Sequence, residues 1–133
     1  MRVSLHCDGG SRGNPGPAAV GVVIRDATGE VVAEVSQVIG IATNNVAEYE
    51  AVIRGLERAS ELGATSVDLI GDSELIAKQI TGEYKVKHPD MKPLHAAAVS
   101  ALAGFEDWTI RTVPRAQNAD ADALVNQALD AAR

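Results

Sequence analysis

Two kinds of hydrophobic pattern succeed one another along the first half of the chain. In residues 2–8 apolar and polar side chains alternate, which is the period of a strand with one buried face. Residues 18–25 are almost all apolar, as in a central strand, and a turn signal at 26–29 leads into a third strand predicted over 30–38. These residues predict a meander of three antiparallel strands.

Helical spacing begins after the meander. It predicts a long helix over 43–62, stopped by Gly63, and a short strand over 66–70 follows. A strand that follows such a crossover is expected to lie parallel to its neighbour in the sheet. The order βββαβααβα therefore predicts one mixed sheet with helices packed on it. The remaining predicted elements are a helix over 73–80, a helix over 94–104, a strand over 108–113, a loop over 114–117 and a helix over 118–131.

Length and composition indicate a single globular domain over residues 1–133. The chain is 46% hydrophobic and 23% charged, has no apolar run long enough to span a membrane, and starts as a strand, not a signal peptide. We expect no membrane association. One cysteine excludes an internal disulfide and fits a cytoplasmic protein, and its place in the alternation indicates that Cys7 is a small buried residue.

The net charge of −6 argues against non-specific nucleic-acid binding, which depends on Lys and Arg. A cluster of acids that binds Mg²⁺ would also lower this count. The net charge therefore does not exclude a metal-dependent enzyme that acts on nucleic acid.

Four acids lie at the predicted ends of elements, where ligand sites collect in open sheets. Asp8 ends the first strand and precedes a turn rich in glycine and proline, Glu48 lies in the first turn of the long helix, Asp72 follows the fourth strand, and Asp122 lies in the first turn of the last helix. Four carboxylates would make an all-oxygen site that suits Mg²⁺ or Mn²⁺ and not zinc.

Each acid also has a structural interpretation. Glu48 has capping-box spacing, Asp72 could be an N-cap, and Asp120 and Asp122 both complement the positive end of a helix dipole. Asp8 has no cap to make, and a metal site and a simple strand end remain equally open for it.

Four segments carry specific motifs: Asp8–Gly16, Thr43–Glu48, Gly71–Ser73 and Arg115–Asp122. In this order and spacing they resemble type 1 ribonuclease H, the family that cuts the RNA strand of RNA/DNA hybrids. The resemblance covers essentially the whole chain. In the last segment the family pattern places the acid four residues after an Asn and before a small residue and Leu, which selects Asp122 over Asp120.

The resemblance implies a ribonuclease-H-like α/β fold: a mixed five-stranded sheet, three antiparallel strands then two parallel, with helices on both faces. It further implies that Asp8, Glu48, Asp72 and Asp122 are catalytic and hold two Mg²⁺ ions about 4 Å apart, with Mn²⁺ able to substitute. One ion would activate a water and the other would stabilise the departing 3′ oxygen, leaving 5′-phosphate and 3′-hydroxyl products.

The same resemblance implies how RNA is told from DNA. The 2′-hydroxyl would be read by Glu48 and by the backbone of Gly9, Gly10 and Ser11. Cleavage would be largely independent of sequence, double-stranded RNA is a second candidate partner, and we expect a cytoplasmic monomer. The other implied nucleic-acid contacts are Asn14, Asn44 and Asn45 in the minor groove and Thr43 at a DNA phosphate.

Three departures from the family pattern stand out. The long basic protrusion of many members is replaced by residues 83–92, whose three lysines form either a solvated loop or a weak phosphate contact. Arg115 stands in the loop where many members have a His, so its auxiliary role is open. Glu74 replaces a Gln that contacts the hybrid, and an acid there should repel phosphate.

Two other classes of function remain as alternatives. One is a binding module that grips a hybrid or double-stranded RNA without cutting it. The other is a different metal nuclease on the same scaffold, such as a 3′ exonuclease or a junction resolvase. Those nucleases share clustered acids but lack the Asp-Gly-Gly turn combined with Thr-Asn-Asn before the helix Glu.

Overall fold

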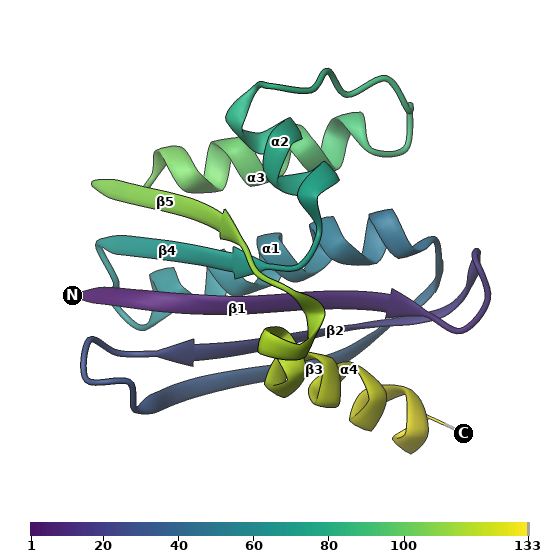
Figure 1. Cartoon of the computed structure of the whole chain (residues 1–133), viewed down its shortest axis with the longest axis horizontal. Coiled ribbons are helices and arrows are strands. Elements are labelled where there is room, and N and C mark those ends of the chain that lie inside the picture. The colour runs from purple at the N-terminus through teal and green to yellow at the C-terminus, as the bar shows by residue number, and fades with distance from the viewer. Residues whose placement is uncertain (133) are drawn as a thin grey trace.

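Three successive strands open the chain and are followed by helices with two further strands among them, over residues 1–132, the part that the computed structural model describes (Figure 1). The predicted domain, 1–133, includes Arg133, which lies outside the described residues. The strands are β1 (Arg2–Ser11), β2 (Gly16–Arg25), β3 (Val31–Ala42), β4 (Ser66–Gly71) and β5 (Asp107–Thr112). The helices are α1 (Asn44–Glu61), α2 (Glu74–Thr81), α3 (Lys92–Ala103), the 3₁₀ helix η1 (Arg115–Asn118) and α4 (Ala119–Ala131).

Strand β1 lies at the centre of one five-stranded sheet with the order β3-β2-β1-β4-β5. It pairs antiparallel with β2, where Asp8 lies opposite Gly21, and parallel with β4, where the ladder ends at the pair His6–Ile70. β2 pairs antiparallel with β3, and β4 pairs parallel with β5. The predicted mixed sheet, three antiparallel strands then two parallel, is confirmed.

Helices cover both faces of this sheet, as predicted. On one face the main core joins side chains of β1, β2 and β4 to α1, α2 and α3, with Tyr49 and Leu56 fully buried. On the other face α4 lies across β2 and β3 (Figure 1), and Val125 and Leu129 pack on Ala19. Because β2 is covered on both faces, nearly every side chain of its sequence is apolar.

The first strand is longer than predicted, and Asp8 is not at its end. The ladder with β2 continues through Gly9, Gly10 and Ser11, and the turn begins only at Arg12. The predicted strand end was wrong because glycine was taken as a turn signal, whereas these glycines are extended and only Gly13 in this region has a positive φ.

Other elements also differ from their predicted boundaries. β2 begins two residues earlier, toward its turn with β1, and β3 continues to Ala42, which pairs with Gly16 at the start of β2; the predicted loop at 114–117 forms η1. Residues 82–91 contain no helix or strand, which agrees with a compact form without a protrusion, and Lys85 and Lys87 are exposed there. Among the described residues no helix is both long and apolar enough to cross a membrane.

Candidate active site

Asp8 is the most deeply buried acid of the described residues, with 6% of its surface exposed. Its strand is paired with β2 through this position, but its ladder with β4 has already ended two residues earlier. The neighbouring strand therefore diverges at Asp8, which is where an open sheet makes room for a ligand.

Glu48 reaches the same place from α1 and is not a helix cap. The N-cap of α1 is Thr43, whose hydroxyl accepts a hydrogen bond from Val46 N, and Glu48 lies beyond the first turn, which corrects the predicted placement. The backbone N–H of Gly9 donates to Glu48 Oε1 at 3.4 Å. A Cβ at Gly9 would lie 2.2 Å from the backbone of Ala47, so only glycine lets α1 approach β1 this closely.

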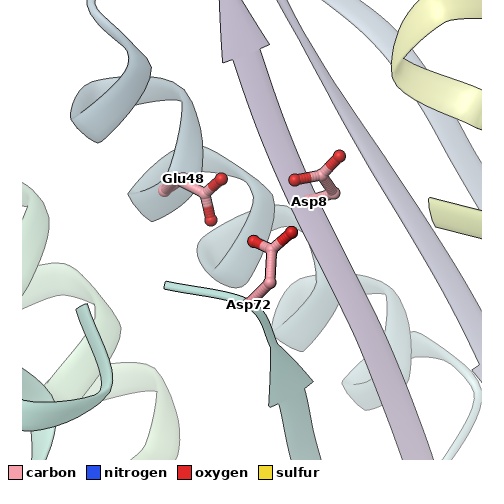
Figure 2. Close-up of side chains that lie close together, drawn as sticks. All are labelled: Asp8, Glu48 and Asp72. Atoms are coloured by element: carbon pink, nitrogen blue, oxygen red, sulfur yellow. The ribbon is translucent and has the colours of Figure 1, made fainter. Parts of the chain in front are cut away.

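Asp72 follows β4 and also makes no cap, because Ser73 accepts from Ile76 N at the start of α2. One carboxylate oxygen each from Asp8, Glu48 and Asp72 lies within 4.8 Å of the others. Figure 2 shows the three side chains converging from β1, α1 and the end of β4. The chain thus brings together three of the four predicted acids.

Asp122 borders the same cavity from α4 without joining the tight group of three. Its Oδ1 lies 3.5 Å from Nη2 of Arg115, and Asn126 Nδ2 donates to its carboxylate. Asp120, the competing acid, faces away and pairs with Arg25 at 2.8 Å. Packing therefore directs Asp122, the acid that the family pattern selects, to the cavity and Asp120 to Arg25.

The open cavity in front of the acids is lined by Gly9, Gly10, Ser11 and Asn44 besides the four acids. Burial raises the pKa of Asp8 above its usual range, and the charge of Asp72 raises it further. Burial and then the charge of Asp8 raise the pKa of Glu48. Both shifts arise because like charges are held together away from water.

The donor set fits a divalent metal ion. Within residues 1–132 no Lys or Arg forms an ion pair with Asp8, Glu48 or Asp72, so the gathered negative charge lacks a compensating cation. Carboxylate oxygens are hard ligands of the kind that Mg²⁺ and Mn²⁺ prefer. The absence of His and Cys from the group argues against zinc.

Hydrogen bonds join three of the predicted nucleic-acid contacts to one another: Ser11, Asn44 and Asn14. Asn44 Oδ1 accepts from the backbone N–H and from the hydroxyl of Ser11 at 2.9 and 3.0 Å. Asn14 Oδ1 accepts from Asn44 N at 3.0 Å. Asn14 and Asn45 are exposed but do not line the acidic cavity, and neither does Thr43.

Three residues at the site were given no role by the sequence analysis. Arg12 lines the cavity and pairs with Asp130 at 2.7 Å, and Asn126 lies one turn after Asp122. The spacing of four between Asp122 and Asn126 was a signal for that contact. Asn118 is 1% exposed and donates to the carbonyl of Cys7; it lay inside a quoted motif, but its partner is remote in sequence.

Comparison with known proteins places the chain in a family. The family model "Reverse transcriptase-like" matches residues 6–128. A ribonuclease HI from Halobacterium salinarum is 51% identical over 129 residues, which is 97% of this chain. The chain spans 65% of that relative's own length and 36% of the length of three mycobacterial relatives.

Solved structures agree in fold. RNase H1 from Halobacterium salinarum superposes with a TM-score of 0.96 at 51% identity, covering 98% of both chains. LC11-RNase H1, solved in complex with an RNA/DNA hybrid, superposes with a TM-score of 0.93 at 44% identity, again over 98% of both chains. With a family model over most of its length and a relative of this similarity, the chain belongs to the ribonuclease HI family.

Proposed function

We propose that the chain is an endoribonuclease that hydrolyses the RNA strand of RNA/DNA hybrids, largely without regard to sequence. The observation that carries the proposal is the convergence of Asp8, Glu48 and Asp72 within 4.8 Å, in a cavity bordered by Gly9–Ser11. The similarity to LC11-RNase H1, which was solved with such a hybrid, supports the choice of substrate.

The acids would hold two Mg²⁺ ions, for which Mn²⁺ could substitute, with Asp122 completing the set. When bound, the ions would supply the Lewis acidity that activates a water and stabilises the departing 3′ oxygen. Water oxygen then bonds to phosphorus as the bond to the 3′ oxygen breaks, so the products carry a 5′-phosphate and a 3′-hydroxyl.

The protein's own contribution is to hold the carboxylates in place before substrate arrives. Gly9 N–H fixes one oxygen of Glu48, and β1 fixes the backbone of Asp8. Arg115, whose side chain is 81% exposed, stays beside Asp122 and is free to turn toward a phosphate. We assign it the auxiliary role that a loop His has in other members.

Selectivity for RNA rests on groups that meet the 2′-hydroxyl, which both donates and accepts hydrogen bonds. Both donors of Ser11 are already directed to Asn44, so its hydroxyl oxygen remains as an acceptor for substrate. Glu48 and the backbone of Gly9 and Gly10 supply the other contacts at this edge of the cavity. The minor groove would be contacted by Asn14, Asn44 and Asn45, and a DNA phosphate by Thr43.

The test is cleavage of an end-labelled RNA/DNA hybrid over a titration of Mg²⁺ and of Mn²⁺. We expect cleavage of the RNA strand only, loss of cleavage in Asp8→Asn, and normal cleavage in Asp120→Asn, a matched control that pairs with Arg25 and does not line the cavity. Double-stranded RNA and single-stranded DNA are run beside the hybrid. Faster degradation of single-stranded DNA would indicate a different nuclease, and full activity of Asp8→Asn would refute the metal assignment.

We further propose that the enzyme acts as a monomer, because all four acids come from one chain. Size-exclusion chromatography with light scattering, under the conditions of the cleavage assay, measures the molar mass of the active protein and so tests this proposal. A dimer whose dissociation abolishes cleavage would contradict it.

A further inference from the structure

The side chain of Asn118 is a buried amide whose nitrogen makes a hydrogen bond and whose oxygen makes none within the described residues. Asn118 is the last residue of η1 and the N-cap of α4, with 1% of its surface exposed. Its Nδ2 donates to the carbonyl oxygen of Cys7 at 2.9 Å. Its Oδ1 is buried and has no hydrogen-bond partner within residues 1–132. Such a group is unfavourable for stability, because a buried acceptor without a donor loses its bond to water.

The Cys7 carbonyl belongs to the peptide bond that leads into Asp8. The ladder between β1 and β4 ends at the pair His6–Ile70, one residue earlier. Asn118 thus donates to β1 at the point where β4 diverges and the cavity opens. The amide cannot be turned around, because Oδ1 would then face another carbonyl oxygen.

The other end of this contact is Asp122. Asn118 immediately precedes α4, and Asp122 follows it by four residues, which is about one helical turn. A shift of the start of α4 would therefore move Asp122 relative to Asp8. The Asn118 contact bridges 111 residues of sequence and is made by a side chain, so no backbone ladder duplicates it.

We propose that Asn118 is a positioning residue: it holds the backbone at Asp8 and the first turn of α4 together, so that Asp8 and Asp122 face one metal site. The proposal rests on the metal site of the proposed function. A polar side chain kept in a buried place at a cost in stability is expected at a functional site and not in an ordinary core.

Two variants and one control test the proposal. Asn118→Ala removes the contact. Asn118→Leu removes it with the same number and branching of side-chain heavy atoms and deletes the unsatisfied oxygen, so it leaves no void of the kind that alanine leaves. Ser36→Ala is the matched control, because the Ser36 hydroxyl donates to Leu124 O at 2.7 Å and also ties α4 to the sheet, but from β3 and not from the strand that carries Asp8.

The first measurement is the rise in Tm with Mg²⁺ or Mn²⁺ concentration, without nucleic acid, which reports metal binding to the native state. We expect the apparent metal dissociation constant to rise about tenfold or more in both Asn118 variants, the size of effect that residues supporting metal ligands show. The second measurement is hybrid cleavage. We expect kcat to fall and half-maximal activity to need a higher metal concentration, while KM for the hybrid stays unchanged. Ser36→Ala should match the wild type in both.

The outcomes separate this inference from the proposed function. If the wild type binds metal but cuts no hybrid, the effect of Asn118 on metal binding still decides the inference. Folded Asn118→Leu with wild-type metal affinity would overturn it. An equal loss of metal affinity in Ser36→Ala would also overturn it, because the cause would then be a general loosening of α4.

Discussion

The three gathered carboxylates should destabilise the protein when no metal is bound, and Asp8→Asn isolates this effect. The substitution keeps the size and shape of the side chain but removes one negative charge from the group formed with Glu48 and Asp72. In metal-free buffer at pH 8 we expect the variant to be more stable than the wild type. The same variant should lose metal-dependent cleavage, so stability and activity change in opposite directions.

The magnitude follows from the separation of the acids. Two unit charges 4.8 Å apart repel by about 3.5 kcal/mol at an effective dielectric constant of about 20. Partial protonation already relieves some of this repulsion, as the raised pKa values of Asp8 and Glu48 indicate. We therefore expect a gain of about 2 kcal/mol, which is about 7 °C in Tm for a domain of this length.

The dependence on pH has a definite sign. Because the pKa of Asp8 is raised in the folded protein, the fold binds the proton more tightly than the unfolded chain does. Stability is therefore lost as the pH rises from the ordinary aspartate pKa through the raised one. The advantage of Asp8→Asn should be small near pH 4 and grow toward pH 8.

Thermal unfolding followed by circular dichroism in EDTA, at several pH values, measures the effect. Mg²⁺ should raise the Tm of the wild type more than that of Asp8→Asn, since the ion stabilises the native state by binding to it. Asp120→Asn is the control for loss of a charge, because Asp120 is exposed and paired with Arg25. A Tm of Asp8→Asn equal to or below the wild-type value at pH 8 would refute the repulsion.

Three further predictions concern residues that support the fold. Gly9→Ala should destabilise the fold by about 3 kcal/mol or more, because its Cβ would lie 2.2 Å from the backbone of α1. Gly10→Ala should cost far less, because its Cβ would make an ordinary van der Waals contact at 3.6 Å with Val125, and urea unfolding compares the two variants. Asp68→Asn should lower the Tm at pH 7, and by less as the pH falls below the ordinary aspartate pKa, because Arg2 lowers the pKa of Asp68 and this stability is lost as the pH falls through that lowered pKa. Tyr49→Phe should lower the free energy of unfolding in urea by about 1–2 kcal/mol, since the buried hydroxyl donates to Oε1 of Gln79 in α2 at 2.6 Å.

Each of these predictions has a contradicting outcome. Equal stability of the two glycine variants would show that α1 can move away from β1 without cost. A constant Tm difference for Asp68→Asn across pH would remove the ion pair as its cause. An unchanged Tyr49→Phe would mean that Gln79 finds another donor.

The caps show where sequence patterns were ambiguous and packing was not. Glu48 and Asp72 both stood at positions where a capping role was plausible from sequence. In the folded chain Thr43 and Ser73 make those caps, so the two carboxylates are left for the cluster. Of the two acids in the first turn of α4 the family pattern selects Asp122, and the packing of α4 directs Asp120 to Arg25 and Asp122 to the cavity.

The glycines mark a limit of another kind. From sequence, Gly9 and Gly10 indicated a turn, because glycine favours turns on average. In the structure both are extended, and what requires glycine at position 9 is the backbone of α1. Gly21 has the same explanation on the opposite face, where a Cβ would lie 2.2 Å from the carbonyl oxygen of Ala121 in α4.

The sequence by itself determined the order and kind of the elements, the mixed sheet and the four acids worth testing. The elements follow from periodicity, which records within a few residues which side of an element is buried. The acids follow from their places at the ends of those elements and in the family motifs. Tertiary structure alone decided which acids meet, which glycines admit a helix, and how Asn118 joins the start of α4 to β1. Those contacts connect residues far apart in the chain, as with the 111 positions between Asn118 and Cys7, and local patterns carry no measure of such distances.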